Sequence, residues 1–246
     1  MKESIINIPT QAGSVDTFLC HPERRAPWPG VLLFMDAPGI REELYDIARR
    51  IATVGYCVAL PNLFYRHGHG TTCLPEATDE STAEFQRMMR LMQSLTNRMI
   101  VEDTGALLAF LDRQNLVKKP ALGCVGYCMG GGFAVTAAAA YPERFSACAS
   151  FYGVPLVTDQ ADSPHRAVAH MKSKAYFCFG EADVLTPKSD IDALRVALQA
   201  ASVHYELEVY EGADHGFVFP QRAAYRKAHA EKHWERLFEL FRDTIG

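Results

Sequence analysis

The fold is decided by the stretch Gly123-Cys124-Val125-Gly126-Tyr127-Cys128-Met129-Gly130-Gly131-Gly132-Phe133. An apolar run, residues 121–125, leads into it, and the alanine-rich run 133–140 follows. This pattern predicts a buried strand, a sharp turn and a helix. The spacing Gly-x-Cys-x-Gly matches the nucleophile elbow, with cysteine in the serine position. We therefore interpret Cys128 as a nucleophile at the apex of the turn.

The elbow pattern carries a steric and an electrostatic argument. Side chains two residues before and after the apex would collide with the neighbouring strand and helix, so both positions require glycine. The N–H groups at the start of the helix favour a thiolate and an oxyanion near Cys128. The alternative interpretation is a glycine-rich turn that happens to contain a buried cysteine.

Composition restricts the class of protein. The 246 residues are 48% hydrophobic and 22% charged, as expected for one globular domain over residues 1–246. With 25 basic and 29 acidic residues, the net charge of −4 offers no surface for nucleic acid or an anionic membrane. The N-terminus has no apolar leader segment, which predicts a cytoplasmic protein. Seven cysteines, an odd number within apolar runs, argue against a disulfide framework.

Strand and helix patterns alternate along most of the chain. Residues 4–8 and 15–20 are expected to form a hairpin, and further strands are expected over 30–35, 56–60, 121–125, 147–151, 175–179 and 205–210. Helices are expected over 42–54, 85–95, 100–111 and 133–140, from Thr186-Pro187 onward, and over 222–244. Residues 65–80 are expected to form a long surface loop at the rim of a site. The alternation predicts an α/β fold with a mostly parallel central sheet and helices on both faces.

Two further residues complete a catalytic pattern with Cys128. Asp183 follows the expected strand 175–179, and His215 follows the next one, 205–210. Loops at the carboxyl ends of parallel strands converge on one crevice, so these side chains can meet although they are far apart in sequence. The order nucleophile, acid, histidine predicts a triad in which His215 takes the proton of Cys128 and Asp183 orients the imidazole.

At these positions the sequence resembles the dienelactone hydrolase family of α/β-hydrolases. Residues 126–131 are similar to that family's Gly-Tyr-Cys-x-Gly-Gly elbow, and Gly180-x-x-Asp183 and His215-Gly216-Phe217 to its acid and histidine motifs. Gly55-Tyr56 and Pro61-x-Leu63-x-x-Arg66 extend the resemblance over nearly the whole chain. It implies an α/β-hydrolase fold and hydrolysis of a small carboxylic ester or lactone, as in a carboxymethylenebutenolidase, with no cofactor.

The resemblance also assigns residues around the triad. It implies an oxyanion hole made by the backbone N–H groups of Ala37 and Met129. It places Asp36 where the family has a glutamate that contacts the resting thiol. Further substrate-binding residues are expected at Arg66, Phe85 and Phe217.

One part of the family pattern is absent. Counting forward without gaps, the arginines that bind the substrate carboxylate in dienelactone hydrolases fall on Ser81 and Phe219. Arg66 and Arg222 are candidate substitutes, and the alternative is that both are solvated surface arginines. The sequence therefore predicts a substrate that is not held by a two-arginine clamp.

Alternatives and partners follow from the same residues. A general carboxylesterase or thioesterase would use the same scaffold, and a thiol redox or ligand sensor would need Cys128 alone, with Cys124 as a weak candidate for a resolving thiol. His67 with His69, and His229 with His233, do not have the spacing and partners of a metal site, so no metal is expected. We expect a small-molecule substrate and a monomer or weak dimer.

Overall fold

The computed structural model describes residues 1–24, 26–74 and 80–246. The expected loop 65–80 therefore lies partly outside the described residues. The chain forms two compact units, Met1–Pro120 and Ala121–Gly246. The prediction of an α/β fold with a mostly parallel sheet is confirmed, because strand pairs in both units are parallel.

The first unit contains four strands in the order β1-β2-β4-β3. The hairpin β1 (Lys2–Thr10) and β2 (Gly13–His21) is antiparallel, and β2 pairs antiparallel with β4 (Cys57–Pro61). The fully buried strand β3 (Trp28–Phe34) pairs with β4 in parallel. A strand buried on both faces needs apolar side chains throughout, which is why this segment has no polar alternation.

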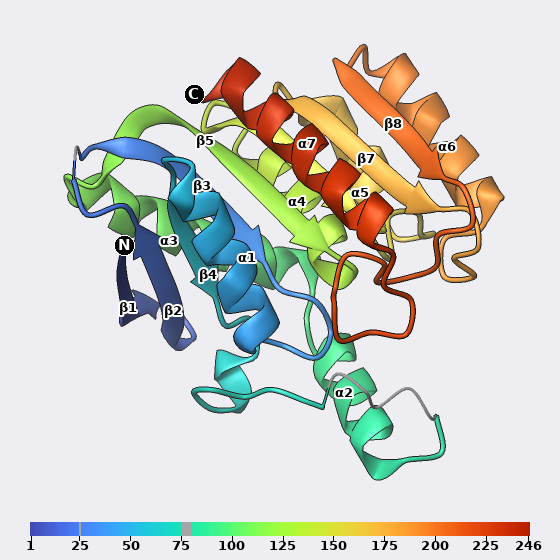
Figure 1. The fold of residues 1–246 in the computed structure, drawn as a ribbon, viewed down its shortest axis with the longest axis horizontal. Coiled ribbons are helices and arrows are strands. Elements are labelled where there is room, and N and C mark those ends of the chain that lie inside the picture. The colour runs from blue at the N-terminus through green and yellow to red at the C-terminus, as the bar shows by residue number, and fades with distance from the viewer. Residues whose placement is uncertain (25, 75–79) are drawn as a thin grey trace. The chain divides into compact units, whose positions relative to one another are not determined.

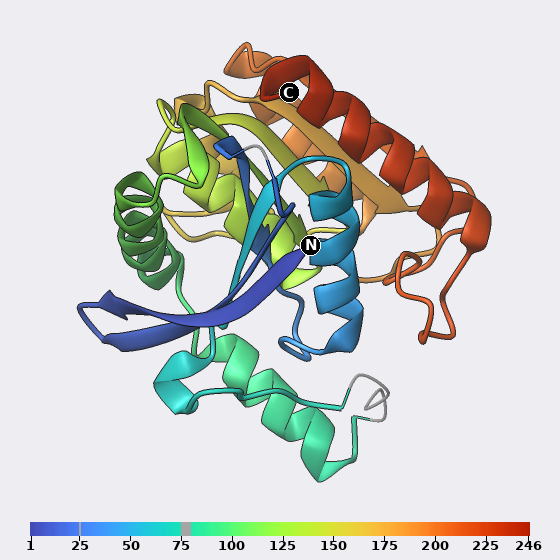
Figure 2. The ribbon, with the colours of Figure 1, turned by 60° about the vertical axis from the view of Figure 1, so that its left-hand side comes forward.

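Helices cover both faces of these strands. The helices are α1 (Glu42–Thr53), α2 (Ala83–Gln93) and α3 (Asn97–Arg113), with a short 3₁₀ turn η1 at Tyr65–His67. Figures 1 and 2 show α1 and α3 on opposite sides of the strands. Thr82 and Thr96 cap α2 and α3 by accepting a backbone hydrogen bond three residues on. In α2 only Leu91 is buried.

The second unit contains four parallel strands in register. They are β5 (Val117–Tyr127), which begins in the first unit, β6 (Phe145–Phe151), β7 (Lys174–Gly180) and β8 (Tyr205–Tyr210). Tyr127 pairs with Phe151, Phe151 with Cys178, and Gly180 with Tyr210. The strands therefore end together, and the residues that follow them share one edge of the sheet.

The helices of this unit are α4 (Met129–Ala140), the short α5 (Pro164–Ala167), α6 (Lys188–Ala200) and α7 (Lys227–Thr244), with a 3₁₀ turn η2 at Val168–His170. Figure 1 shows α7 in front of the strands, with α4 and α6 behind them. Two expected boundaries are wrong. Pro187, rather than Thr186, is the N-cap of α6, and α7 starts five residues after the expected Arg222.

Candidate active site

Cys128 lies at a strained turn between β5 and α4. It is the N-cap of α4 with φ 54° and ψ −126°, a left-handed conformation that few non-glycine residues adopt. A Cβ atom on Gly126 would lie 1.8 Å from the carbonyl oxygen of Gly130. The backbone cannot make room there, so the turn requires glycine at residue 126, as the elbow pattern predicts.

The backbone of Cys128 is tied to the turn after β6. Its N–H donates to the carbonyl of Phe151 (3.2 Å), and its own carbonyl accepts from Gly131 (2.9 Å) and Val154 (3.0 Å). The side chain is half-buried, whereas the six other cysteines are buried. These contacts fix the apex and leave its thiol the most accessible in the chain.

A buried hydrogen bond supports the elbow from behind. The Tyr127 hydroxyl lies 2.7 Å from Nε2 of His233 on α7, and both residues are fully buried. Nδ1 of His233 lies 3.2 Å from the Ala230 carbonyl, which can only accept. Nδ1 therefore carries the proton and Nε2 accepts from Tyr127. His233 is therefore a core histidine, because this hydrogen bond satisfies the ring where it is buried.

His229, in contrast, is half-buried, and its Nε2 is 3.1 Å from the Glu211 carbonyl. His67 and His69 are exposed, and His67 hydrogen-bonds Ser94. Within the described residues, no group of three or more histidine, cysteine or acidic side chains has the geometry to hold a metal ion.

Asp183 and His215 meet at the carboxyl edge of the second unit's strands. Nδ1 of His215 lies 2.8 Å from Oδ2 of Asp183, and the Asp183 side chain is fully buried. The other carboxylate oxygen accepts from the N–H of Leu185 (2.9 Å). The two loops are also joined directly, because the N–H of Ala182 donates to the carbonyl of Ala213 (2.9 Å). Geometry of this kind fixes both the tautomer and the orientation of an imidazole.

The environment of His215 favours the charged imidazole. Burial alone would lower its pKa, but the negative charge of a Cys128 thiolate and the hydrogen bond to Asp183 raise it from 6.5 to about 10. Nε2 of His215 is buried and has no hydrogen-bond partner among the described residues. The Cys128 thiol is near enough for its negative charge to raise the pKa of the ring.

Sequence reasoning missed Tyr152, which follows β6. Its buried ring lies 5.0 Å from the ring of His215. The same edge-of-sheet argument that singled out Asp183 and His215 applies to this residue, since Phe151 is the last residue of β6. A signal was therefore present, although tyrosine is not a residue type that a triad requires.

Phe217 is fully buried, 5.2 Å from the Tyr152 ring and 5.4 Å from the Tyr210 ring. Its ring packs inside the histidine loop, and its expected role in substrate binding stays a prediction. Phe85 is half-buried on α2, and its expected role stays a prediction.

Asp36 and Ala37 lie in the first unit, directly after β3. Asp36 is fully buried and bound by Arg41, whose two terminal nitrogens lie 2.6 and 3.0 Å from the carboxylate oxygens. Arg41 also donates to the carbonyl of Gly39 and to the buried Glu43. This ion pair stabilises the turn that carries Ala37. The roles of Ala37 and Met129 as oxyanion donors stay predictions.

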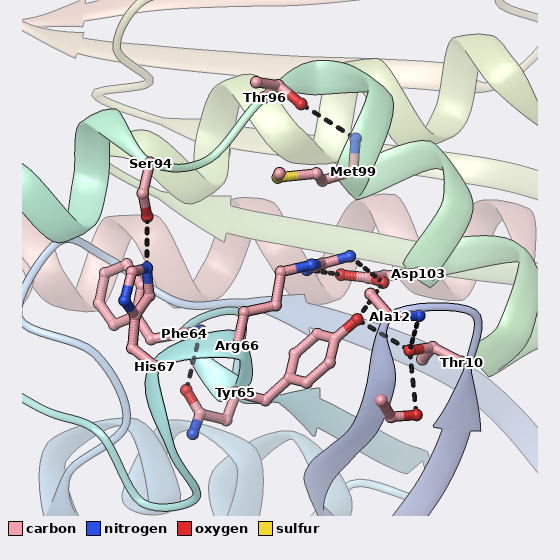
Figure 3. Close-up of polar contacts among 12 residues, drawn as sticks. Thr10, Ala12, Phe64, Tyr65, Arg66, His67, Ser94, Thr96, Met99 and Asp103 are labelled. Carbon is pink, nitrogen blue, oxygen red and sulfur yellow. Dashed lines mark hydrogen bonds and ion pairs between the residues drawn. The ribbon is translucent and has the colours of Figure 1, made fainter.

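Arg66 is not a solvated surface arginine. It donates to both carboxylate oxygens of the buried Asp103, at 2.8 and 2.9 Å (Figure 3). The hydroxyl of Tyr65 donates to the same carboxylate (2.8 Å). A bidentate pair with a buried carboxylate is costly to break. Its guanidinium is therefore committed to anchoring η1 on α3 rather than to a ligand.

The two positions on which the family's substrate-binding arginines fall carry uncharged side chains here. Ser81 is exposed, and Phe219 is buried with the Arg222 guanidinium 5.5 Å from its ring. A Cβ on Gly216, which has φ 85°, would lie 3.0 Å from Cδ of Arg222. The side chain of Arg222 therefore packs against Gly216, the residue after His215.

A strained turn with Cys128 at its apex, followed by a loop with Asp183 and a loop with His215 on parallel strands flanked by helices, is the arrangement of an α/β-hydrolase. The sequence matches the model of the dienelactone hydrolase family over residues 15–245. The chain belongs to the dienelactone hydrolase family, and it is a hydrolase of the class that acts on ester or lactone bonds. The match includes residues of both compact units, and the expectation of a single domain stays a prediction.

Individual relatives agree with this assignment. The chain is 27% identical to the "Putative carboxymethylenebutenolidase" of Synechocystis sp., covering 100% of this chain and 98% of that one. It is 27% identical to the "Probable 2-oxo-3-(5-oxofuran-2-ylidene)propanoate lactonase" of Bradyrhizobium sp., covering 93% and 89%. The crystal structure of a "Putative Dienelactone Hydrolase" from Klebsiella pneumoniae superposes with a TM-score of 0.85 at 23% identity, covering 98% of each chain. None of the helices in the described segments combines the length and apolarity of a membrane span.

Proposed function

We propose that the protein hydrolyses a small carboxylic ester or lactone with Cys128 as nucleophile, His215 as proton carrier and Asp183 as its orienting acid. The observation that carries the proposal is the 2.8 Å hydrogen bond between His215 and Asp183, at the same sheet edge as the strained turn of Cys128. The Bradyrhizobium relative's name indicates a lactone substrate, which agrees with this chemistry.

The first half of the reaction forms a thioester. The Cys128 sulfur attacks the carbonyl carbon, and the carbonyl π electrons move to its oxygen, where the N–H of Met129 at the start of α4 and that of Ala37 are proposed to donate. As the tetrahedral intermediate collapses, the carbon–oxygen bond of the ester breaks. The leaving alkoxide takes the proton of the His215 imidazolium. In a lactone, the leaving hydroxyl stays attached to the acyl chain.

The second half regenerates the enzyme. Neutral His215 takes a proton from water while the water oxygen attacks the thioester carbon. Collapse releases the carboxylic acid and the Cys128 thiolate, with His215 again protonated. Asp183 stays ionised throughout and holds the imidazole in one tautomer.

Substrate recognition is proposed to differ from the two-arginine clamp implied by the family resemblance. Ser81 is exposed, Phe219 is buried, and Arg66 is paired with Asp103, so none of the three offers a guanidinium for a substrate carboxylate. Arg222, beside Gly216, is the remaining candidate. We propose a neutral ester or lactone as the preferred substrate.

The experiment is a panel of small aryl esters, acyl thioesters and five- and six-membered lactones, with the intact protein mass measured during turnover. The proposal expects hydrolysis and a transient acyl adduct on Cys128. Preference for thioesters over esters would favour the thioesterase alternative. No hydrolysis of any class, with Cys128 merely oxidised by peroxide, would favour a thiol sensor.

A further inference from the structure

We infer that Tyr152 is a positioning residue for His215, and that residues 151–154, called here the β6 turn, brace the three loops of the proposed triad. The inference deepens the proposed function and rests on it, because His215 has to act with Cys128 for its orientation to matter. The β6 turn contains no carboxylate, imidazole or thiol, so we propose that it acts through contacts with the residues that carry these groups.

The backbone of Tyr152 is strained. Its φ is 39°, in the left-handed region, where bulky side chains are rare. In the described part of the chain, only Cys128 and Ser202 are other non-glycine residues with positive φ. The N–H of Tyr152 donates to the carbonyl of Cys178 on β7 at 2.6 Å, which holds this conformation. A glycine would occupy the position without strain, so the ring has to supply something that glycine lacks.

That contribution is a contact with the imidazole. The Tyr152 ring is fully buried, 5.0 Å from the His215 ring at an interplanar angle of 66°. The ring also neighbours Phe217, at 5.2 Å and 70°, and Tyr127, at 6.1 Å and 47°. Edge-to-face packing is the favourable arrangement of such rings. His215 is thus held by Asp183 through Nδ1 and by Tyr152 through its ring, and the two contacts together fix the direction of Nε2.

The β6 turn also contacts the backbone of Cys128 and the strand β7, which precedes Asp183. The carbonyl of Phe151 accepts from the Cys128 N–H, and the N–H of Val154 donates to the Cys128 carbonyl. The hydrogen bond from Tyr152 to Cys178 joins the turn to the strand that ends just before Asp183. Three of these four consecutive residues therefore contact the backbone of Cys128, the strand that precedes Asp183 and the ring of His215.

The test compares Tyr152→Leu, which removes the ring, with Tyr152→Phe, which keeps it. Tyr176→Leu is the matched control, because Tyr176 is a buried tyrosine on β7 whose ring packs on Phe151, 5.6 Å away. The readout is the rate at which iodoacetamide alkylates Cys128 across pH, located by mass spectrometry, with kcat and KM measured in parallel. Alkylation needs no substrate turnover, so it stays informative even if the proposed hydrolysis is wrong.

The expected result is specific to the ring. Tyr152→Leu should lower the alkylation rate at neutral pH by about tenfold and converge with the wild type at high pH, since a misdirected imidazolium no longer stabilises the thiolate. The kcat of Tyr152→Leu should fall with little change in KM. Tyr152→Phe should have the alkylation rate and the kcat of the wild type. Tyr176→Leu should lower the melting temperature without changing the pH profile.

Tyr152→Asn provides a second variant if the leucine protein does not fold. Asparagine tolerates a left-handed backbone, so it removes the ring with less strain. It should show the same loss of alkylation at neutral pH. A folded Tyr152→Leu or Tyr152→Asn protein with the wild-type profile would overturn the inference. So would a Tyr176→Leu protein with the same altered profile, or a phenylalanine variant as impaired as leucine.

Discussion

Cys124 and Cys128 are four residues apart, yet their surroundings differ in every respect that matters for reactivity. Cys124 lies inside β5 with no exposed surface, and its thiol donates to the carbonyls of Ala134 and Ala147 at 3.5 and 3.6 Å. Burial raises the pKa of Cys124 well above its usual value. Cys128 lies at a strained, half-buried turn beside His215. Residue type alone therefore does not distinguish the two cysteines, whereas backbone conformation and partners do.

The largest effect expected from this comparison is on activity. Cys128→Ala should lower kcat/KM for the best ester or lactone by about 10⁴-fold or more, because the bond-forming atom is lost. Cys124→Ala should leave it within about threefold, since its thiol is a small buried hydrophobe. Steady-state kinetics of both variants check this. Equal losses would mean that the difference between the two cysteines is not catalytic.

The next largest effect is expected from changing Asp183 and His215, which are the proposed partners of Cys128 but not of Cys124. Asp183→Asn and His215→Ala should each lower kcat by about 10³- to 10⁴-fold with the fold retained, because they act on proton transfer. Their losses should not add in the double variant. Circular dichroism provides the control for folding. A double variant that loses the product of the two single effects would show that Asp183 and His215 act independently.

A smaller effect tests the turn that separates the two cysteines. Gly126→Ala should destabilise the protein by about 3 kcal/mol or more, because the new methyl group would meet the Gly130 backbone at 1.8 Å. Gly212→Ala is the control, with φ 61° and nothing within 4 Å of the added carbon. It should cost only about 1–2 kcal/mol of backbone strain. Urea unfolding measures both, and equal costs would show that the close approach at the elbow is relieved elsewhere.

Titration of His215 sharpens the comparison further. Because the Cys128 charge and Asp183 raise its pKa to about 10, the imidazole should stay protonated through neutral pH and lose its proton as pH rises through about 10. Cys128→Ala removes the largest raising cause, so the titration should move to lower pH, while Cys124→Ala should not change it. Histidine NMR across pH measures this. An unchanged titration in Cys128→Ala would mean that thiol and imidazole do not interact.

The smallest expected effect is on recognition of charge. With no arginine at residues 81 and 219, a neutral ester should be turned over at least as well as a matched anionic one, and added salt should change kcat/KM by less than about twofold. A strong anionic preference that disappears in Arg222→Gln would instead assign substrate binding to Arg222. Arg222→Lys would then restore part of it, since lysine keeps the charge but not the bidentate fork.

Local patterns predicted most of the fold. The strand and helix order followed from periodicity, and the elbow, acid and histidine positions followed from their places after strands. What the sequence did not reveal depends on side chains from distant segments. The buried pair of Tyr127 and His233 needs α7 against β5, and the pairing of Arg66 with Asp103 needs η1 against α3. Periodicity along one element carries no information on such contacts, which arise only when elements pack.

The measurement that tests the central claim most directly is a plot of remaining hydrolytic activity against the fraction of Cys128 alkylated. The protein would be treated with increasing iodoacetamide, and the modified residues located by mass spectrometry in the same samples. The account predicts that activity falls in proportion to modification of Cys128 and reaches zero when it is complete, with Cys124 unlabelled. Full activity at stoichiometric modification of Cys128 would contradict it.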